Sequence, residues 1–284
     1  MPATRDRAAG HGEFRYSDKR LQGLWEKLHR GDREPWPEPG WIARLGKGNA
    51  SFAAWLGANG EASGVAQALR NAWRDFHAGS FSSAIRLGGA QGALGATVAN
   101  KAAAIDALYG RSNAAEHLRA LDAAAKRGEA AVKLLPDYSN AHYMLALVLG
   151  RYSQGISIIK AVAAGLASRV RSHLERALEL EPRHAEAHVA LGLYHAELIG
   201  KLGAMAAGLT YGASRDEALK HFQQALKLSP ASAIVRMEYA NGLLLLDATR
   251  NRGEAEALYR EAAAFAPLDA MENLDIQRAK SGVD

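Results

Sequence analysis

A spacing of small, aromatic and proline residues occurs twice near the end of this 284-residue chain. The first copy is Ala218, Phe222, Ala225 and Pro230, and the second is Ala255, Tyr259, Ala262 and Pro267. Steps of three and four residues place side chains on one face of an α-helix, and a proline ends the helix before it. Pro136 and Pro182 end two earlier helical stretches. The chain therefore predicts helical units stacked in one continuous array.

The pattern resembles the second helix of the tetratricopeptide repeat (TPR) superfamily. Helices expected after three of the prolines carry residues at the sites where this repeat has Trp, Leu, Gly and Tyr. These are His142, Leu145, Ala146 and Leu149; His188, Leu191, Gly192 and His195; and Arg236, Tyr239, Ala240 and Leu243. The resemblance implies an all-α, TPR-like right-handed helical solenoid.

All three repeats are longer than the 34 residues of a standard unit, two of them by 12 and 14 residues. The four prolines lie 46, 48 and 37 residues apart, and both helices of each unit stay in phase with the repeat pattern. The extra residues must therefore lie between the helices, as Gly/Ala-rich inserts at 150–167 and 200–213. Such loops emerge on one edge of a solenoid, which is often the binding face.

The first insert carries a more specific resemblance. Residues 149–154, followed by Ser157, Ile158 and Lys160, are similar to the corresponding insert of the regulator of microtubule dynamics family, and the likeness extends over 131–278. The resemblance implies links to microtubules, organelle contact sites and, in one member, lipid binding, although those members reach membranes through N-terminal anchors, which we do not expect in this chain. Residues 187–241 also resemble the TPR protein associated with TRAP transporters.

The chain divides into four expected regions. Residues 1–47 are a tail (1–15), a short helix (16–29) and a strap rich in Trp and Pro, followed by degenerate helical repeats at 48–136. Residues 137–267 form three TPR-like units, and 268–284 form a capping helix and tail, the helix at 269–280. The indoles of Trp36 and Trp41 either pack on the first repeat or bind a partner.

Composition limits the possible partners and compartments. Hydrophobic residues make up 48% and charged residues 23%, and the formal charge of +5 is spread among acidic residues, so we expect no nucleic-acid binding. Residues 1–19 contain no secretory signal, and the longest apolar stretch, 161–166, is far below the roughly 20 residues that span a bilayer. We therefore expect a cytoplasmic protein without a membrane span.

The sequence does not favour an enzyme, a cofactor or a metal site. Residues 46–48, Gly-Lys-Gly, lack the Ser or Thr of a phosphate-binding loop. His184, His188 and His195 share one helix face, but Ala185 stands where a zincin motif needs Glu. We interpret these histidines as packing residues.

The TPR resemblance implies that the inner face of the first helices is the binding surface. Counting along the repeats gives a largely apolar strip that includes Tyr143, Leu147, Arg151, Val189, Leu193, Glu197, Met237 and Asn241. The leading hypothesis is a scaffold that binds a protein or peptide segment there. The alternative is a carrier or sensor of a lipid-like hydrophobic molecule under the inserts. A third is that the inserts fill the groove and other faces bind.

Overall fold

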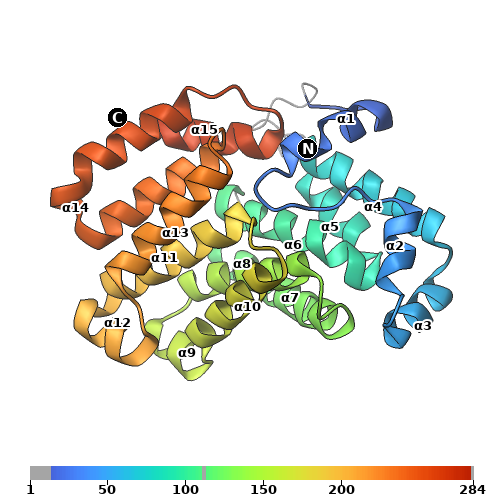
Figure 1. Ribbon diagram of the computed structural model, residues 1–284, viewed down its shortest axis with the longest axis horizontal. Coiled ribbons are helices and arrows are strands. Elements are labelled where there is room, and N and C mark those ends of the chain that lie inside the picture. Colours follow the sequence, from blue (N-terminus) through green and yellow to red (C-terminus); the bar gives the residue numbers. More distant parts are fainter. Residues whose placement is uncertain (1–13, 111–112, 283–284) are drawn as a thin grey trace.

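The computed structural model describes residues 14–110 and 113–282, and all regular structure within those ranges is helical. This confirms the predicted all-α repeat fold (Figure 1). The helices are α1 (Asp18–Leu28), α2 (Pro39–Leu45), α3 (Ala50–Asn59), α4 (Ala62–His77), α5 (Phe81–Gly89), α6 (Gly92–Tyr109), α7 (Ala114–Leu134), α8 (Ser139–Gln154), α9 (Ile158–Ala163), α10 (Leu166–Leu180), α11 (Ala185–Leu202), α12 (Ala204–Tyr211), α13 (Arg215–Leu228), α14 (Ala233–Ala263) and α15 (Ala270–Ser281).

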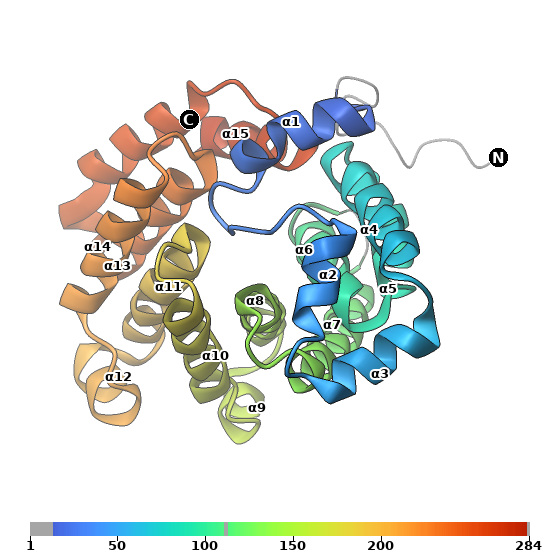
Figure 2. The same cartoon turned by 45° about the vertical axis from the view of Figure 1, so that its right-hand side comes forward.

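Paired helices stack along the chain from α4 onward. α8 pairs with α10 and α11 with α13, while α14 contains the third pair, divided at the non-helical backbone of Asp247. The short helices α9 and α12 lie in the two inserts, and both occupy the same lower edge of the molecule in Figures 1 and 2.

A repeated hydrogen bond fixes the start of each unit. A side chain on the first helix contacts the carbonyl oxygen of the proline that ends the preceding unit. The pairs are His142 with Pro136 (2.9 Å), His188 with Pro182 (3.2 Å) and Arg236 with Pro230. These residues stand at the repeat's Trp site, so a polar contact replaces part of the usual aromatic packing.

Close packing between the last units depends on two glycines. A Cβ atom on Gly192 of α11 would lie 2.6 Å from the ring of Phe222, and one on Gly242 of α14 would lie 2.3 Å from it. Real Cβ atoms do not approach so closely, so both helices can contact Phe222 only because these side chains are absent. The small-residue site of the repeat pattern therefore has a direct packing role.

The N-terminal segment crosses the body of the molecule. Residues 29–38, which we call the strap, connect α1 to α2 without forming a helix. Trp36 packs edge-on against Trp25 at 4.9 Å, and Trp41 packs against Tyr138 at 5.6 Å, so both indoles contact the chain itself. Most of the predicted tail, residues 1–13, lies outside the described residues, but Phe14 is buried rather than part of a free tail.

The predicted terminal helix is present as α15. The Asp269 side chain caps it by accepting a hydrogen bond from the Glu272 amide (2.7 Å). Ile276 packs in one apolar cluster with Ala255 and Ala262, the face expected from sequence. Met271 instead packs near the N-terminal part of the chain, in a cluster with Trp25 and Trp73, so α15 brings the two ends of the molecule together (Figure 2).

Candidate functional site

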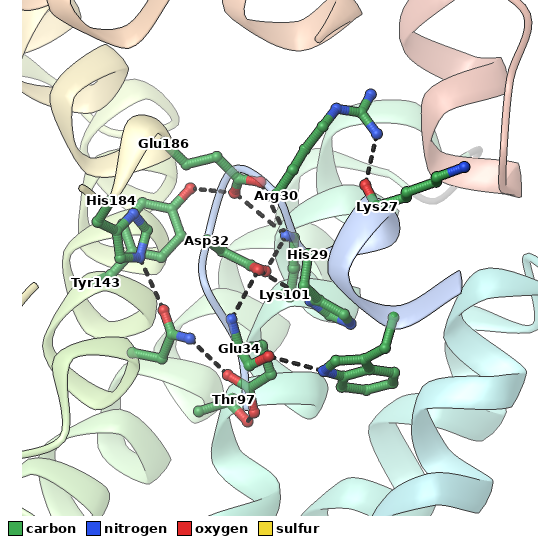
Figure 3. A network of polar contacts seen from close by, with 12 residues as sticks. Lys27, His29, Arg30, Asp32, Glu34, Thr97, Lys101, Tyr143, His184 and Glu186 are labelled. Atoms are coloured by element: carbon green, nitrogen blue, oxygen red, sulfur yellow. Dashed lines mark hydrogen bonds and ion pairs between the residues drawn. The ribbon is translucent and has the colours of Figure 1, made fainter. Parts of the chain in front are cut away.

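The concave surface formed by α6, α8 and α11 is covered by the strap (Figures 2 and 3). The Gly31 carbonyl accepts a hydrogen bond from the Glu186 amide at the start of α11 (3.0 Å). Arg33 adopts a left-handed backbone with φ of 56°, a conformation that costs a non-glycine residue roughly 1–2 kcal/mol. The contacts described next offset this cost and hold the strap in place.

A buried cation binds the strap to the repeats. Lys101 of α6 is 3% exposed, and its Nζ lies 2.5 Å from Asp32 Oδ2 and 3.2 Å from Glu186 Oε2. The hydroxyl of Tyr143 donates to the same Glu186 oxygen at 2.9 Å. Burial would raise the pKa of the Asp32 carboxyl, but Lys101 and His29 hold that pKa well below its usual value. Asp32 is therefore a charged partner of Lys101.

A second set of contacts fixes Glu34 of the strap. Glu34 accepts hydrogen bonds from Asn140 Nδ2 (2.6 Å) and the Thr97 hydroxyl (3.2 Å). Asn140 Oδ1 in turn lies 2.8 Å from His184 Nε2, while His184 Nδ1 accepts from the Ala187 amide (3.0 Å). This assigns the His184 proton to Nε2, which then donates to Asn140. Burial, with Asp32 adding to it, raises the pKa of Glu34 to about 8.

A small cavity lies on the concave surface. A cavity of about 70 Å³ lies between the repeats and α15, whose Met271 and Asp275 line it. Five of the eight predicted groove residues also line it: Tyr143, Leu147, Arg151, Val189 and Leu193. The strap and α15 thus occupy most of the surface on which a partner segment was expected.

We expected one shared cavity for six of the strip residues, Tyr143, Leu147, Val189, Leu193, Met237 and Asn241, but the last two do not line it. Met237 is 1% exposed and packs in a cluster with Ile276 and Ala279 of α15. Asn241 donates to Glu238 (2.8 Å) and accepts from the Tyr259 hydroxyl. The sequence rule treats the inner face of a repeat as open, but here the terminal helix packs against it.

A larger cavity, which we call the insert pocket, lies next to the small one, on the side of the inserts, and shares Leu147, Arg151 and Leu193 with it. It has a volume of about 510 Å³ and is enclosed by α8, α10 and α11 together with both inserts. Its wall is mostly aliphatic and aromatic, with Leu147, Val170, Leu193, Leu198, Leu202 and Tyr211 among the lining residues. Ile158 and Val162 of α9 line it and remain 47% and 53% exposed, so the pocket opens to solvent on that side.

Polar groups gather at one end of the insert pocket. Predicted groove residues Arg151 and Glu197 both line it. Arg151 Nη2 lies 3.2 Å from Glu238 Oε1, and Gln154 donates to Glu197, which also pairs with Lys201 at 2.9 Å. The charges at this end are paired within the protein, while their polar atoms can still orient the head of an amphiphilic ligand.

Gly150 gives the pocket part of its width. This helical residue of α8 lines the cavity, and a Cβ atom placed on it would meet no atom within 4 Å. The space beside it is therefore pocket rather than packed core.

The alternative hypothesis placed a ligand under the inserts, but the sequence did not identify which residues line the wall there. Leu198, Leu202, Ile158 and Val162 lie outside the inner positions counted from the repeat pattern. A usable signal was present, because the inserts contain large aliphatic residues where a solvent-exposed loop normally has polar ones.

The three histidines considered for metal binding form separate hydrogen bonds, although the rings of His188 and His195 both approach that of His221. His184 caps α11, His188 Nδ1 lies 2.9 Å from His221 Nδ1, and His195 Nδ1 accepts from the Ser214 amide at 3.4 Å. Burial lowers the pKa of each of them, and that of His184 falls to about 3. The lowered pKa values favour the neutral imidazole in each, and each has a hydrogen-bond partner within the protein. In the described residues no helix is long and apolar enough to cross a bilayer.

Comparison with known proteins places this arrangement in a family. A solved structure, a thermophilic TPR protein from Thermus thermophilus, has 20% sequence identity and a TM-score of 0.55, and the match covers 76% of this chain and 99% of that protein. The likeness shows a TPR-like fold. None of the curated proteins matches the chain. Residues 97–280, which include the repeats, both inserts and most of α15, match the family described as regulator of microtubule dynamics protein 1-3, and the chain therefore belongs to that family.

Proposed function

We propose that this protein is a non-catalytic carrier or sensor of a small amphiphilic molecule with an aliphatic chain, bound in the insert pocket. The observation that carries the proposal is the volume and lining of that pocket. About 510 Å³ lies in the range of small-molecule sites, and such sites combine apolar walls with a few polar groups.

The same pocket accounts for part of the predicted strip. Leu147, Arg151, Leu193 and Glu197 line it, so the inner positions contribute to a site whose outer wall is made by the inserts. Apolar atoms of the ligand would contact Leu147 and Leu193, and its polar head would lie toward Arg151 and Glu197. Burial of each methylene would contribute about 0.8 kcal/mol.

Binding of a protein segment in the concave groove has less support. A partner would have to displace the strap, which forms buried contacts with Lys101 and Asn140. A tethered segment also competes at a high effective concentration, which favours the strap over a free peptide.

Filling the pocket tests the proposal. Gly150→Phe places a ring in the space beside α8. Gly253→Phe, at an exposed position of α14, is a matched control because a Cβ atom there also meets no atom within 4 Å. We expect dansyl-labelled undecanoic acid to bind the wild-type chain and the Gly253→Phe variant, and to bind Gly150→Phe at least about tenfold more weakly. Native mass spectrometry should show one probe per wild-type chain. Equal affinity for all three proteins, or no binding to the wild type, would contradict the proposal.

A further inference from the structure

The large hydrophobic side chains most exposed in the described residues gather at the insert edge. Ile158, Ile159 and Val162 belong to α9, Met205 and Leu209 belong to α12, and Leu245 lies beside the end of α11. Ile159, Met205 and Leu209, which we call the insert tips, are 78%, 81% and 85% exposed. Single exposed apolar side chains are normal on a protein surface, whereas a group of them at one edge marks an interaction surface.

Two separate segments create this surface at equivalent places in successive repeats. α9 follows α8, α12 follows α11, and both lie at the lower edge of the molecule (Figures 1 and 2). Ile158 and Val162 belong both to this surface and to the wall of the insert pocket. The exposed apolar surface therefore continues into the mouth of the pocket.

The charges of the inserts indicate which surface they meet. Residues 155–168 and 200–214 contain two lysines and no carboxylate, and since Lys201 pairs with Glu197 at 2.9 Å, Lys160 of α9 is the charge that can meet headgroups. A lysine beside exposed aliphatic residues suits the interface of a bilayer with anionic headgroups, where the apolar side chains enter the acyl boundary and the ammonium group remains among the phosphates. A protein partner would more often be met by an aromatic or mixed-charge surface.

We infer that the insert tips dock on the surface of an anionic phospholipid bilayer, with the mouth of the insert pocket facing the lipid. An aliphatic chain then moves between bilayer and pocket without exposing its methylenes to water, where their hydration is unfavourable. This inference rests on the proposed function, since it assigns the source of the ligand for the same pocket. The contact is peripheral and reversible, because the tips would insert only side chains.

Vesicle binding tests the inference separately from ligand binding. The triple variant Ile159→Ser, Met205→Ser, Leu209→Ser removes the exposed apolar tips, whereas Gly150→Phe fills the pocket and leaves the tips unchanged. On vesicles of phosphatidylcholine containing phosphatidylserine, we expect the wild type and Gly150→Phe to co-sediment equally, and the triple variant to partition at least about tenfold less. The triple variant should still bind dansyl-labelled undecanoic acid in solution.

Charge and self-association provide further outcomes. Lys160→Gln should weaken binding to phosphatidylserine vesicles and leave binding to pure phosphatidylcholine vesicles unchanged. The inference is overturned if the wild type binds neither kind of vesicle, or if the triple variant binds vesicles as well as the wild type does. Either result counts even if the probe still enters the pocket. A wild-type dimer that the triple variant cannot form, detected by light scattering without vesicles, would assign the tips to a second copy of the chain and also overturn it. Loss of probe binding by the wild type would instead contradict the proposed function.

Discussion

The concave groove and the insert pocket share the helices α8 and α11, but they differ in what fills them. The groove contains buried ions and the chain's own strap, and the cavity beneath α15 there measures about 70 Å³. The insert pocket holds about 510 Å³ between apolar walls. A repeat surface is therefore not a binding site by position alone, because segments outside the repeat decide which part of it stays open.

The largest expected effect comes from removing the buried cation of the groove. Lys101→Met leaves Asp32 and Glu186 buried without their partner, and breaking such a pair costs about 3–5 kcal/mol. Lys160→Met, on exposed α9, should change the free energy of unfolding by no more than about 0.5 kcal/mol. Urea unfolding measures both. A Lys101→Met protein as stable as the wild type would mean that the strap contacts do not stabilise the fold.

Two glycine substitutions contrast packed and open positions. Gly192→Ala brings a Cβ atom within 2.6 Å of Phe222, so we expect a loss of about 1–3 kcal/mol. Gly150→Ala meets no atom and should stabilise the helix by about 0.5–1 kcal/mol. Thermal unfolding should therefore shift in opposite directions for the two variants. A shift in the same direction would show that the space beside Gly150 is not open.

A gradual effect should appear in the pH dependence of stability. The pKa of Glu34 is raised from 4.5 to about 8, mainly by burial. Its protonated form therefore stabilises the fold, fully below pH 4.5, and this contribution is lost as the pH rises toward about 8. Glu34→Gln, neutral at every pH, lacks this loss.

The stability of Glu34→Gln relative to the wild type should rise between pH 5 and pH 8, by at most about 1.4 kcal/mol per pH unit. Chemical unfolding of both proteins at several pH values measures this difference in unfolding free energy. Other titrating groups cancel because the two proteins share them. Parallel curves for the two proteins would contradict the raised pKa of Glu34.

The repeats could be predicted from sequence because their signals are local. The helices α10 and α13 end at Leu180 and Leu228, just before Pro182 and Pro230. The small residues Gly192 and Ala225 occupy buried positions, as the pattern requires. Each signal depends on side chains within one or two helical turns, so a single sequence contains it.

The site could not be predicted to the same degree because it depends on distant contacts. Asp32 and Lys101 are 69 residues apart, and nothing near either of them indicates that the strap crosses the groove. Met237 was assigned to the groove because the repeat rule does not include a terminal helix on that face. The inserts were expected at one edge, but their helices and the pocket wall depend on how two separate segments pack.

Photo-crosslinking tests most directly whether the insert pocket, rather than the concave groove, receives the ligand. A fatty acid that carries a diazirine on its chain would be irradiated with the wild-type protein, and the labelled peptides would be identified by mass spectrometry. We predict labels in residues 147–166 and 193–211 that disappear in Gly150→Phe. Labels on Lys101, Tyr143 or Met271, with none in the inserts, would contradict the account and show that the ligand enters the groove beneath α15.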